Sequence, residues 1–244
     1  MSWHHGRLAL FDTETTGVDP HEDRIVTAAI LLVGGGQPTI RRSWMLRCTR
    51  PIPDGAAAIH GITTEHANTH GIDHAVGVGA IAEELVQASS LGIPIVGHNV
   101  AYDVTILRAE LQRHGHTRLA EQVSSIEPVI DTYVCDKWVD PYRKGSRRLV
   151  DISNHYGVPL DESDAHGAEA DALAAGRVAW VMANRWPGLQ MPLRELHREQ
   201  VGWKREQAES FGRYLVKHER VDDVSRCWPI LERVEVAEAV AVAS

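Results

Sequence analysis

Two acidic residues, Asp12 and Glu14, directly follow the short apolar run 8–11. The run has the length of a buried strand, and side chains alternate between the two faces of a strand, so both carboxylates are expected on the same side. At about 4 Å and an effective dielectric constant near 20, their repulsion is roughly 4 kcal/mol. A shared proton, a basic neighbour or a cation must offset this repulsion. Because only oxygen ligands are offered, the pattern favours a hard cation such as Mg²⁺ or Mn²⁺; acids that merely cap the next turn are the plainer alternative.

A third acid, Asp103, lies in the segment His98-Asn-Val-Ala-Tyr-Asp103, directly after the short apolar stretch 93–97. Helical periodicity from Val100 to about His114 predicts that Asp103 lies in the first turn of a helix that follows a strand. Open α/β sheets bind their ligands at the carboxyl ends of the strands. Charge complementarity at a helix N-terminus, worth about 0.3–1 kcal/mol, is the alternative explanation for this acid.

The fourth acid, Asp171, is expected in the first turns of an alanine-rich helix that opens within 164–171 and runs to about Arg185. His166 lies just before this helix or at its start, where a histidine is more often a cap or a surface residue than a catalytic one. The three patterns are D-x-E-T-T-G, H-N-x-x-Y-D and H-x-x-x-x-D. In this order and at these separations, they indicate one acidic site assembled from three segments.

The elements that must position these residues follow from hydrophobic periodicity and from turn residues. In chain order, we expect strands at 8–11, 24–33 and 39–46, a loop at 51–63, a helix at 75–88, a strand at 93–97, a helix at 100–114, a strand at 128–131, and helices through 134–138, at 149–156, within 164–185 and at 193–218. The first three strands should form an antiparallel meander, and the two later strands should run parallel to the first. This order predicts an α/β fold with a mixed five-stranded sheet flanked by helices.

The composition limits the classes of function. The chain has 244 residues, enough for one large domain or for a domain with an extension, and its formal net charge of −8 argues against binding duplex DNA through a broad basic surface. Only the stretch 143–148 is densely basic, and it is either a solvated loop or a grip on phosphates. No apolar run approaches the roughly 20 residues of a membrane span, and no signal-peptide pattern is seen. The three cysteines are widely spaced, which suits a reducing cytoplasm.

The three motifs resemble those of the DEDDh 3′–5′ exonucleases, the DnaQ-like proofreading family, which has a ribonuclease H-like fold. The resemblance covers about residues 7–185. It implies an exonuclease domain at 1–186, followed at 187–244 by a helical C-terminal extension that has no counterpart in the core fold. At the end of this extension, 234–244, apolar and polar residues alternate only weakly, and this stretch is expected to lack fixed structure.

The resemblance also implies the roles of the site residues. Asp12, Glu14, Asp103 and Asp171 would hold two divalent metal ions, Mg²⁺ or Mn²⁺, and His166 would be the general base. The product of such two-metal hydrolysis at a 3′ end is a nucleoside 5′-monophosphate. The implied substrate contacts are Thr15, Thr16, His60, Asn99, Tyr102, Arg143 and Arg147. Four of them, Thr15, Thr16, Asn99 and Tyr102, should surround one splayed terminal nucleotide, which predicts a preference for a single-stranded 3′ end.

Two alternatives stay open at this point. DNA is favoured over RNA as the substrate, but exonucleases for both share all five catalytic residues, and recognition of the 2′-OH is not visible in the motifs, so an RNA-trimming exoribonuclease is one alternative. The other is a catalytically silent nucleic-acid-binding module on the same fold, although no site residue is missing. The sequence carries no recognisable polymerase-tethering motif, and it leaves a polymerase partner and the oligomeric state open.

Overall fold

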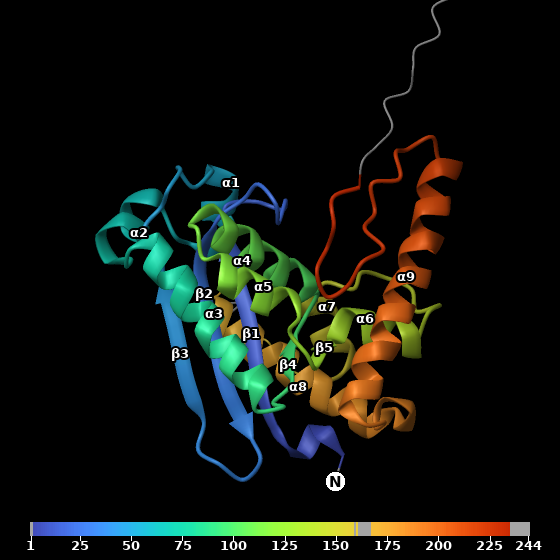
Figure 1. The fold of residues 1–244 in the computed structure, drawn as a ribbon. Coiled ribbons are helices and arrows are strands. Elements are labelled where there is room, and N and C mark those ends of the chain that lie inside the picture. The colour runs from blue at the N-terminus through green and yellow to red at the C-terminus, as the bar shows by residue number, and fades with distance from the viewer. Residues whose placement is uncertain (1, 159, 161–166, 235–244) are drawn as a thin grey trace, which may run out of the picture.

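The computed structural model describes residues 2–158, 160 and 167–234. Within this part of the chain, five strands form one mixed sheet in the order β3-β2-β1-β4-β5 (Figure 1). The strands are β1 (Arg7–Thr15), β2 (Ile25–Gly34), β3 (Ile40–Met45), β4 (Ile95–Gly97) and β5 (Val129–Asp131). β1, β2 and β3 pair antiparallel, whereas β4 runs parallel to β1 and β5 parallel to β4. The predicted α/β fold with a mixed five-stranded sheet is therefore confirmed.

A run of three glycines closes the hairpin between β2 and β3. Gly34, Gly35 and Gly36 have φ angles of 79°, 65° and 68°, in the left-handed region that glycine adopts at little cost. At Gly34, a Cβ atom would also lie 2.5 Å from the carbonyl oxygen of Gly6. The hairpin therefore needs glycine both for its turn and for the close approach of the chain just before β1.

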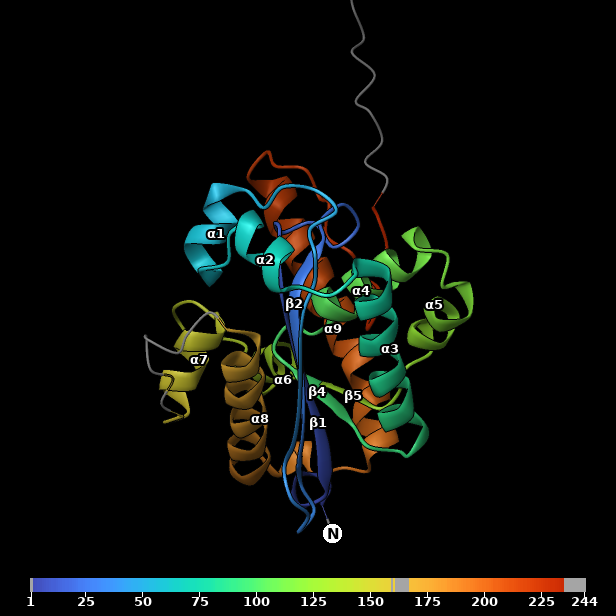
Figure 2. The same ribbon diagram turned by 90° about the vertical axis from the view of Figure 1, so that its left-hand side faces the viewer.

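Helices cover both faces of the sheet, which Figure 2 shows nearly edge-on. One face carries α3 (His74–Ser90) and α4 (Ala101–Arg113), with α5 (Thr117–Ser124) packed against both. The other face carries α8 (Ala168–Arg185), with α7 (Leu149–His155) beside it. In the described part of the chain, none of the helices is long and apolar enough to cross a membrane.

The small side chains of α8 let this helix lie close against the central strand. A Cβ atom at Gly176 would lie 2.5 Å from the side chain of Leu10, so Leu10 faces α8. Because side chains alternate along β1, Asp12 and Glu14 share this face. Thr13 points to the opposite face, which α3 and α4 cover.

One short helix lies within the predicted loop 51–63, and a second follows directly, where no element was predicted. They are α1 (Asp54–His60) and α2 (Thr64–His70), and α5 was not predicted either. Helices of seven residues are too short to be stable alone in water, and their periodicity is too brief to stand out in the sequence. A small apolar cluster that includes Val26, Ile52 and Ala67 holds this segment against the sheet. Tertiary packing therefore decides its structure.

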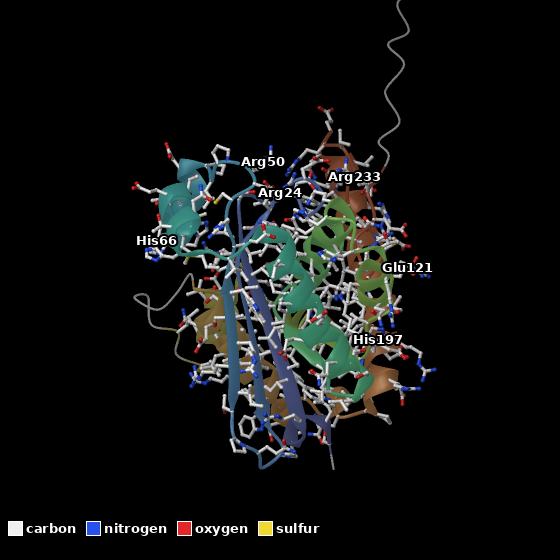
Figure 3. All side chains as sticks on the ribbon, turned by 60° about the vertical axis from the view of Figure 1, so that its left-hand side comes forward. Arg24, Arg50, His66, Glu121, His197 and Arg233 are labelled. Carbon is white, nitrogen blue, oxygen red and sulfur yellow. The ribbon has the colours of Figure 1, made fainter. Side chains whose placement is uncertain are left out.

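The C-terminal helix packs on the edge of the sheet that β5 forms (Figure 1). The remaining elements are the helices α6 (Thr132–Val139) and α9 (Leu193–Lys217) and the 3₁₀ turns Trp3–His5 and Pro187–Leu189. The side-chain amide of Gln200, on α9, takes the place of a further strand: its oxygen accepts from the backbone N–H of Asp131 at 2.8 Å, and its nitrogen donates to the carbonyl of Val129 at 2.9 Å. His197, labelled in Figure 3, accepts from the N–H of Val129 at 3.1 Å. Side chains of α9 therefore satisfy the outward-facing backbone groups of the edge strand.

The segment that follows α9 returns to the core. Trp228, near the end of this segment, is buried, and its ring centroid lies 5.0 Å from that of His197. Arg233 pairs with Glu22, in the turn between β1 and β2. The segment after α9 therefore packs back against α9 and also reaches the turn between β1 and β2, while the domain boundary at 186/187 stays a prediction. The end that was expected to lack fixed structure falls almost entirely on 235–244, outside the described residues.

Replacing Gln200 with leucine is expected to destabilise the protein while keeping the volume of the side chain. The N–H of Asp131 and the carbonyl of Val129 would lose their partners in a buried place, and each orphaned group costs about 1–3 kcal/mol. Urea unfolding should therefore show a loss of about 2–4 kcal/mol. The control is Glu199→Gln, on the exposed neighbouring position, with an expected change within about 0.5 kcal/mol. A loss below 1 kcal/mol in Gln200→Leu would show that the edge strand does not depend on this amide.

Candidate active site

Three carboxylates meet where β1 ends and α8 begins. Asp12 and Glu14 belong to β1, and Asp171 to the first turn of α8. One carboxylate oxygen from each residue lies within 4.8 Å of the other two. The structure thus brings together three of the four acids that the sequence analysis singled out.

The fourth acid, Asp103, approaches from the other side of β1, in the first turn of α4. Its carboxylate is buried and accepts a hydrogen bond from the Thr13 hydroxyl at 2.5 Å. It lies outside the close grouping of three, but its charge raises the pKa values of Asp12 and Glu14. Thr13 was not singled out from the sequence. Strand alternation, which turns Thr13 away from Asp12 and toward α4, is the signal that could have found it.

Burial and mutual repulsion raise the pKa values of these acids. The pKa of Asp12 rises well above its usual value, because of burial first and then because of the charges of the other three acids. Burial, followed by the nearby aspartates, raises the pKa of Glu14 to about 8. Burial also raises the pKa of Asp103 to about 7, against the hydrogen bond from Thr13. Such crowded carboxylates are stable as anions only beside a compensating positive charge.

The described side chains supply no such charge. In that part of the chain, no lysine or arginine forms an ion pair with Asp12, Glu14 or Asp103. The donors are carboxylate oxygens only, which is the set that Mg²⁺ and Mn²⁺ prefer. The residues therefore fit divalent metal ions.

A second grouping of metal-ligand side chains lies between α3 and the end of α4 and consists of His74, Glu110 and His114. Its carboxylate already faces two guanidinium groups: Arg113 pairs with Glu110, and the Nε atom of Arg24 lies 3.6 Å from the same carboxylate oxygen. A divalent ion there would meet two fixed positive charges. The nearby charges therefore distinguish the two groupings, and they favour the grouping at β1 as the site for a divalent ion.

Hydroxyl groups hold the turn that follows the acids of β1. The Tyr102 hydroxyl donates to the carbonyl of Gly17 at 2.6 Å and lies 3.0 Å from the Thr15 hydroxyl. The Thr15 hydroxyl also donates to the Gly17 carbonyl, at 2.8 Å. The Thr16 hydroxyl donates to the Asp23 carboxylate at 2.9 Å. The two bonds of the Tyr102 hydroxyl connect α4 to the end of β1, and a phenylalanine at position 102 could not make them.

His60, at the end of α1, lies beside this turn. Its side chain is buried, and burial lowers its pKa, while the nearby backbone of Thr15 opposes that change. The Nδ1 atom of His60 accepts from the N–H of Ile62 at 3.2 Å. The segment that holds α1 therefore reaches the same end of β1 as Tyr102.

Asn99 occupies a strained position between β4 and α4. Its φ angle is 55°, in the left-handed region that asparagine tolerates better than most residues. Its N–H donates to the buried carboxylate of Asp131 at 2.8 Å, which also accepts from the N–H of Tyr133 at 3.0 Å. Asp131 was not singled out from the sequence, although it ends a buried strand as Asp12 nearly does. It fixes the turn that leads into Asp103.

A family model described as exonuclease (RNase T) matches residues 10–179, a span that contains all four acids. The chain belongs to this exonuclease family. It is 28% identical over 173 residues to the PolC-type DNA polymerase III of Lacticaseibacillus paracasei, which covers 71% of this chain and 11% of that protein. It is 27% identical to the 3′–5′ exonuclease DinG of Bacillus subtilis, and the match covers 79% of this chain and 19% of DinG. It is 29% identical to the DNA polymerase III subunit epsilon of Treponema pallidum, and the match covers 69% of this chain and 72% of that subunit.

Solved structures show the same architecture. Exonuclease I superposes with a TM-score of 0.63 at 22% identity, covering 75% of this chain and 42% of that one. Escherichia coli exonuclease I in complex with a dT13 oligonucleotide superposes with a TM-score of 0.60 at 21% identity, and the match again covers 75% of this chain and 42% of that one. These likenesses support the ribonuclease H-like fold. The present chain spans less than half of these two exonuclease I chains and less than a fifth of PolC and DinG.

Arg143 and Arg147 do not extend freely into solvent, as residues that bind phosphates from a solvated loop would. Both guanidinium groups bind the buried carboxylate of Asp136, Arg143 at 2.8 Å, and the Tyr156 hydroxyl donates to it at 3.0 Å. Burial raises the pKa of Asp136, but these partners outweigh burial and lower it. The side chains of Arg143 and Arg147 are only 11% and 10% exposed. Their packing thus gives both arginines a structural role, and their contact with substrate stays a prediction.

His166, the expected general base, lies outside the described residues. The helix that was expected to open within 164–171 begins at Ala168. The assignment of His166 therefore rests on its position in the H-x-x-x-x-D motif.

Two substitutions separate the role of the Tyr102 hydroxyl group from that of its aromatic ring. Tyr102→Phe removes the hydrogen bonds to the turn, which are worth about 0.5–1.5 kcal/mol each in stability, but keeps an aromatic face. Tyr102→Ala also removes a stacking surface worth about 1–3 kcal/mol per base. We expect Tyr102→Phe to unfold at lower urea and to bind a single-stranded oligonucleotide within about threefold of the parent. Tyr102→Ala should bind about 5- to 150-fold more weakly in fluorescence anisotropy. Equal binding by the two variants would argue against stacking.

Proposed function

We propose that this chain is a metal-dependent 3′–5′ exonuclease that hydrolyses DNA from a single-stranded 3′ end and releases nucleoside 5′-monophosphates. The observation that carries the proposal is the close grouping of Asp12, Glu14 and Asp171, with Asp103 beside it. Membership of the exonuclease family supports the reaction class.

The four acids would hold two divalent ions, Mg²⁺ or Mn²⁺. When bound, such ions act as Lewis acids on a phosphodiester and balance the charge that develops there. Four carboxylates carry a charge of −4, which two divalent ions neutralise. Thr13 orients Asp103 for this task through its hydrogen bond. His166 would accept the proton of the attacking water, because a neutral imidazole with a pKa near 6.5 can do so around neutral pH.

The substrate end would lie against the turn after β1. Thr15, Thr16, Asn99 and Tyr102 surround the end of β1 that carries the acids, and His60 reaches the same place. An aromatic ring and polar groups around one short site suit a splayed terminal nucleotide better than a stacked base pair. The solved exonuclease I structure with a bound dT13 oligonucleotide supports DNA as the first substrate to test. The proposal includes no polymerase partner.

The deciding experiment compares four substrates of identical sequence: single-stranded DNA, single-stranded RNA, blunt duplex DNA and single-stranded DNA blocked at its 3′ end. Mg²⁺-dependent release of mononucleotides from unblocked single-stranded DNA, abolished by EDTA and by the 3′ block, is expected. Faster release from RNA would make the enzyme an exoribonuclease. Oligonucleotide binding without release in either metal would indicate a silent binding module, and equal cleavage of the blunt duplex would contradict the single-strand preference.

A further inference from the structure

A basic groove runs from Asn99 to the outer surface of the C-terminal helix. It has a volume of about 810 Å³ and lies between α6, α9 and the chain before α7. Its lining includes Asn99, Tyr133, Lys137, Lys204 and Phe211. We call it the α6–α9 groove. A smaller hollow of about 460 Å³ shares Lys137 and Phe211 with it and continues along α9.

The groove carries positive charge on two lysines that form no ion pair with any described residue. Among the described residues, neither Lys137 nor Lys204 forms an ion pair with an acidic side chain. Burial, and then the charges of Lys204 and Arg147, lower the pKa of Lys137; burial also lowers the pKa of Lys204, against the charge of Asp131. The nearby Asp136 is already neutralised by its arginines. In a chain with a net charge of −8, two such lysines favour an anionic ligand.

Aromatic rings lie along the same path. Phe211 and Tyr214, on α9, are 46% and 52% exposed, and their rings are parallel within 10°. Trp138 is 38% exposed and stacks on Trp203 with a centroid distance of 4.1 Å. Exposed aromatic faces beside lysines are the combination by which proteins bind single-stranded nucleic acid.

Asn99 links the groove to the candidate active site. It lines the groove and also belongs to the turn that leads into Asp103 in α4. The groove therefore begins beside the segment that carries one of the four acids. The groove is formed in part by α9, which lies beyond the residues that the exonuclease family model matches.

We propose that the α6–α9 groove and the smaller hollow beside it bind the nucleotides that precede the 3′-terminal one. Lys137 and Lys204 contact phosphates, Phe211 stacks on a base in the groove, and Tyr214 stacks on a base in the hollow. This inference rests on the proposed function. It gives the C-terminal extension a role in holding the strand during repeated cleavage. It also predicts that the enzyme prefers long single strands to short ones.

The test uses the full chain with the double variant Lys137→Ala/Lys204→Ala. The control is Arg194→Ala/Arg198→Ala, which removes the same charge from exposed positions in the first turns of α9, outside the groove. The substrates are the p-nitrophenyl ester of thymidine 5′-monophosphate, which can occupy only the terminal site, and the oligonucleotides dT4 and dT20. The loss of kcat/KM in the lysine variant should grow with length and reach at least tenfold for dT20. The salt dependence of dT20 binding should become shallower by about 0.7 for each lost phosphate contact, or about 1.4 in all.

A second variant, Phe211→Ala/Tyr214→Ala, separates stacking from charge. It should weaken dT20 binding about 5- to 150-fold without changing the salt dependence. Parental kinetics on dT20 in the lysine variant, or an equal loss in the arginine control, would overturn the role of the groove. If the parent hydrolyses neither the ester nor dT20, the proposed function fails instead. Binding of dT20 in EDTA then still tests the groove, because the lysines do not depend on metal.

Discussion

Replacing Asp12 with asparagine is expected to abolish nucleotide release and, at the same time, to stabilise the metal-free protein. Asparagine keeps the shape of the side chain but removes one charge from the crowded site. The loss of one oxyanion-hole donor costs about 10²–10³-fold in rate. The rate of Asp12→Asn should fall by more than this, because a residue that would hold metal is lost. The melting temperature in EDTA at pH 8 should rise, since burial and the other three acids oppose the charge on Asp12.

The pH dependence of this effect has a defined sign. Acids whose pKa values are raised in the native state bind more protons there than in the unfolded chain, so stability falls as pH rises from the unfolded values near 4 through the native ones. For Glu14 and Asp103 the native values are about 8 and about 7. The metal-free parent should therefore lose stability between about pH 4 and 8, and Asp12→Asn should lose less. Mg²⁺ should restore the parent more than the variant.

Thermal unfolding in EDTA and in Mg²⁺, at pH 5 and pH 8, measures both effects. The control is Glu169→Gln on the same turn of α8 as Asp171, because Glu169 pairs with Arg41 on the surface rather than with the acids. It should keep the parental rate. Normal turnover in Asp12→Asn, or a lower melting temperature at pH 8 in EDTA, would contradict the metal site.

Replacing His166 with alanine is expected to lower the single-turnover rate by about 10²–10⁴-fold, the usual contribution of general-base catalysis. The imidazole must be neutral to accept a proton, so the parental rate should rise with pH through the histidine titration near 6.5. The variant should lose this rise. Its stabilisation by Mg²⁺ should survive, because all four carboxylates remain.

Chemical rescue distinguishes this role from a structural one. Added imidazole should restore part of the rate of His166→Ala, which it would not do if the residue merely capped a helix, a contribution worth about 1 kcal/mol of stability. His155→Ala, an exposed histidine on α7, is the control and should keep both rate and pH profile. A His166→Ala variant with most of the parental rate would remove His166 from the mechanism.

Local sequence patterns correctly predicted the helices that are long or strongly periodic. The helices expected at 75–88 and 193–218 are His74–Ser90 and Leu193–Lys217, because an amphipathic stripe repeats several times within each. The two helices within 51–70 have too few turns for such a repeat, and their stability comes from contacts with the sheet. Sequence patterns thus succeed where one element contains its own signal.

The acids of the site were found for the same reason. Asp12, Glu14 and Asp103 stand at the junction of a buried strand with a turn or a helix, and this junction is visible in a few consecutive residues. The carboxyl ends of β1 and β4 then lie side by side because the two strands run parallel. The sequence by itself therefore determined the sheet, the fold class and the acid-bearing segments.

Only the tertiary structure decided which partner each polar side chain has. Thr13 binds Asp103 because β1 turns it toward α4, Arg143 and Arg147 are taken up by the buried Asp136, and Gln200 meets β5 because α9 returns to the sheet edge. These contacts join residues far apart in the chain, and they form because a buried polar group without a partner costs more than the contact itself gains. Spacing along a sequence contains no measure of that burial, which exists only once the helices have packed on the sheet.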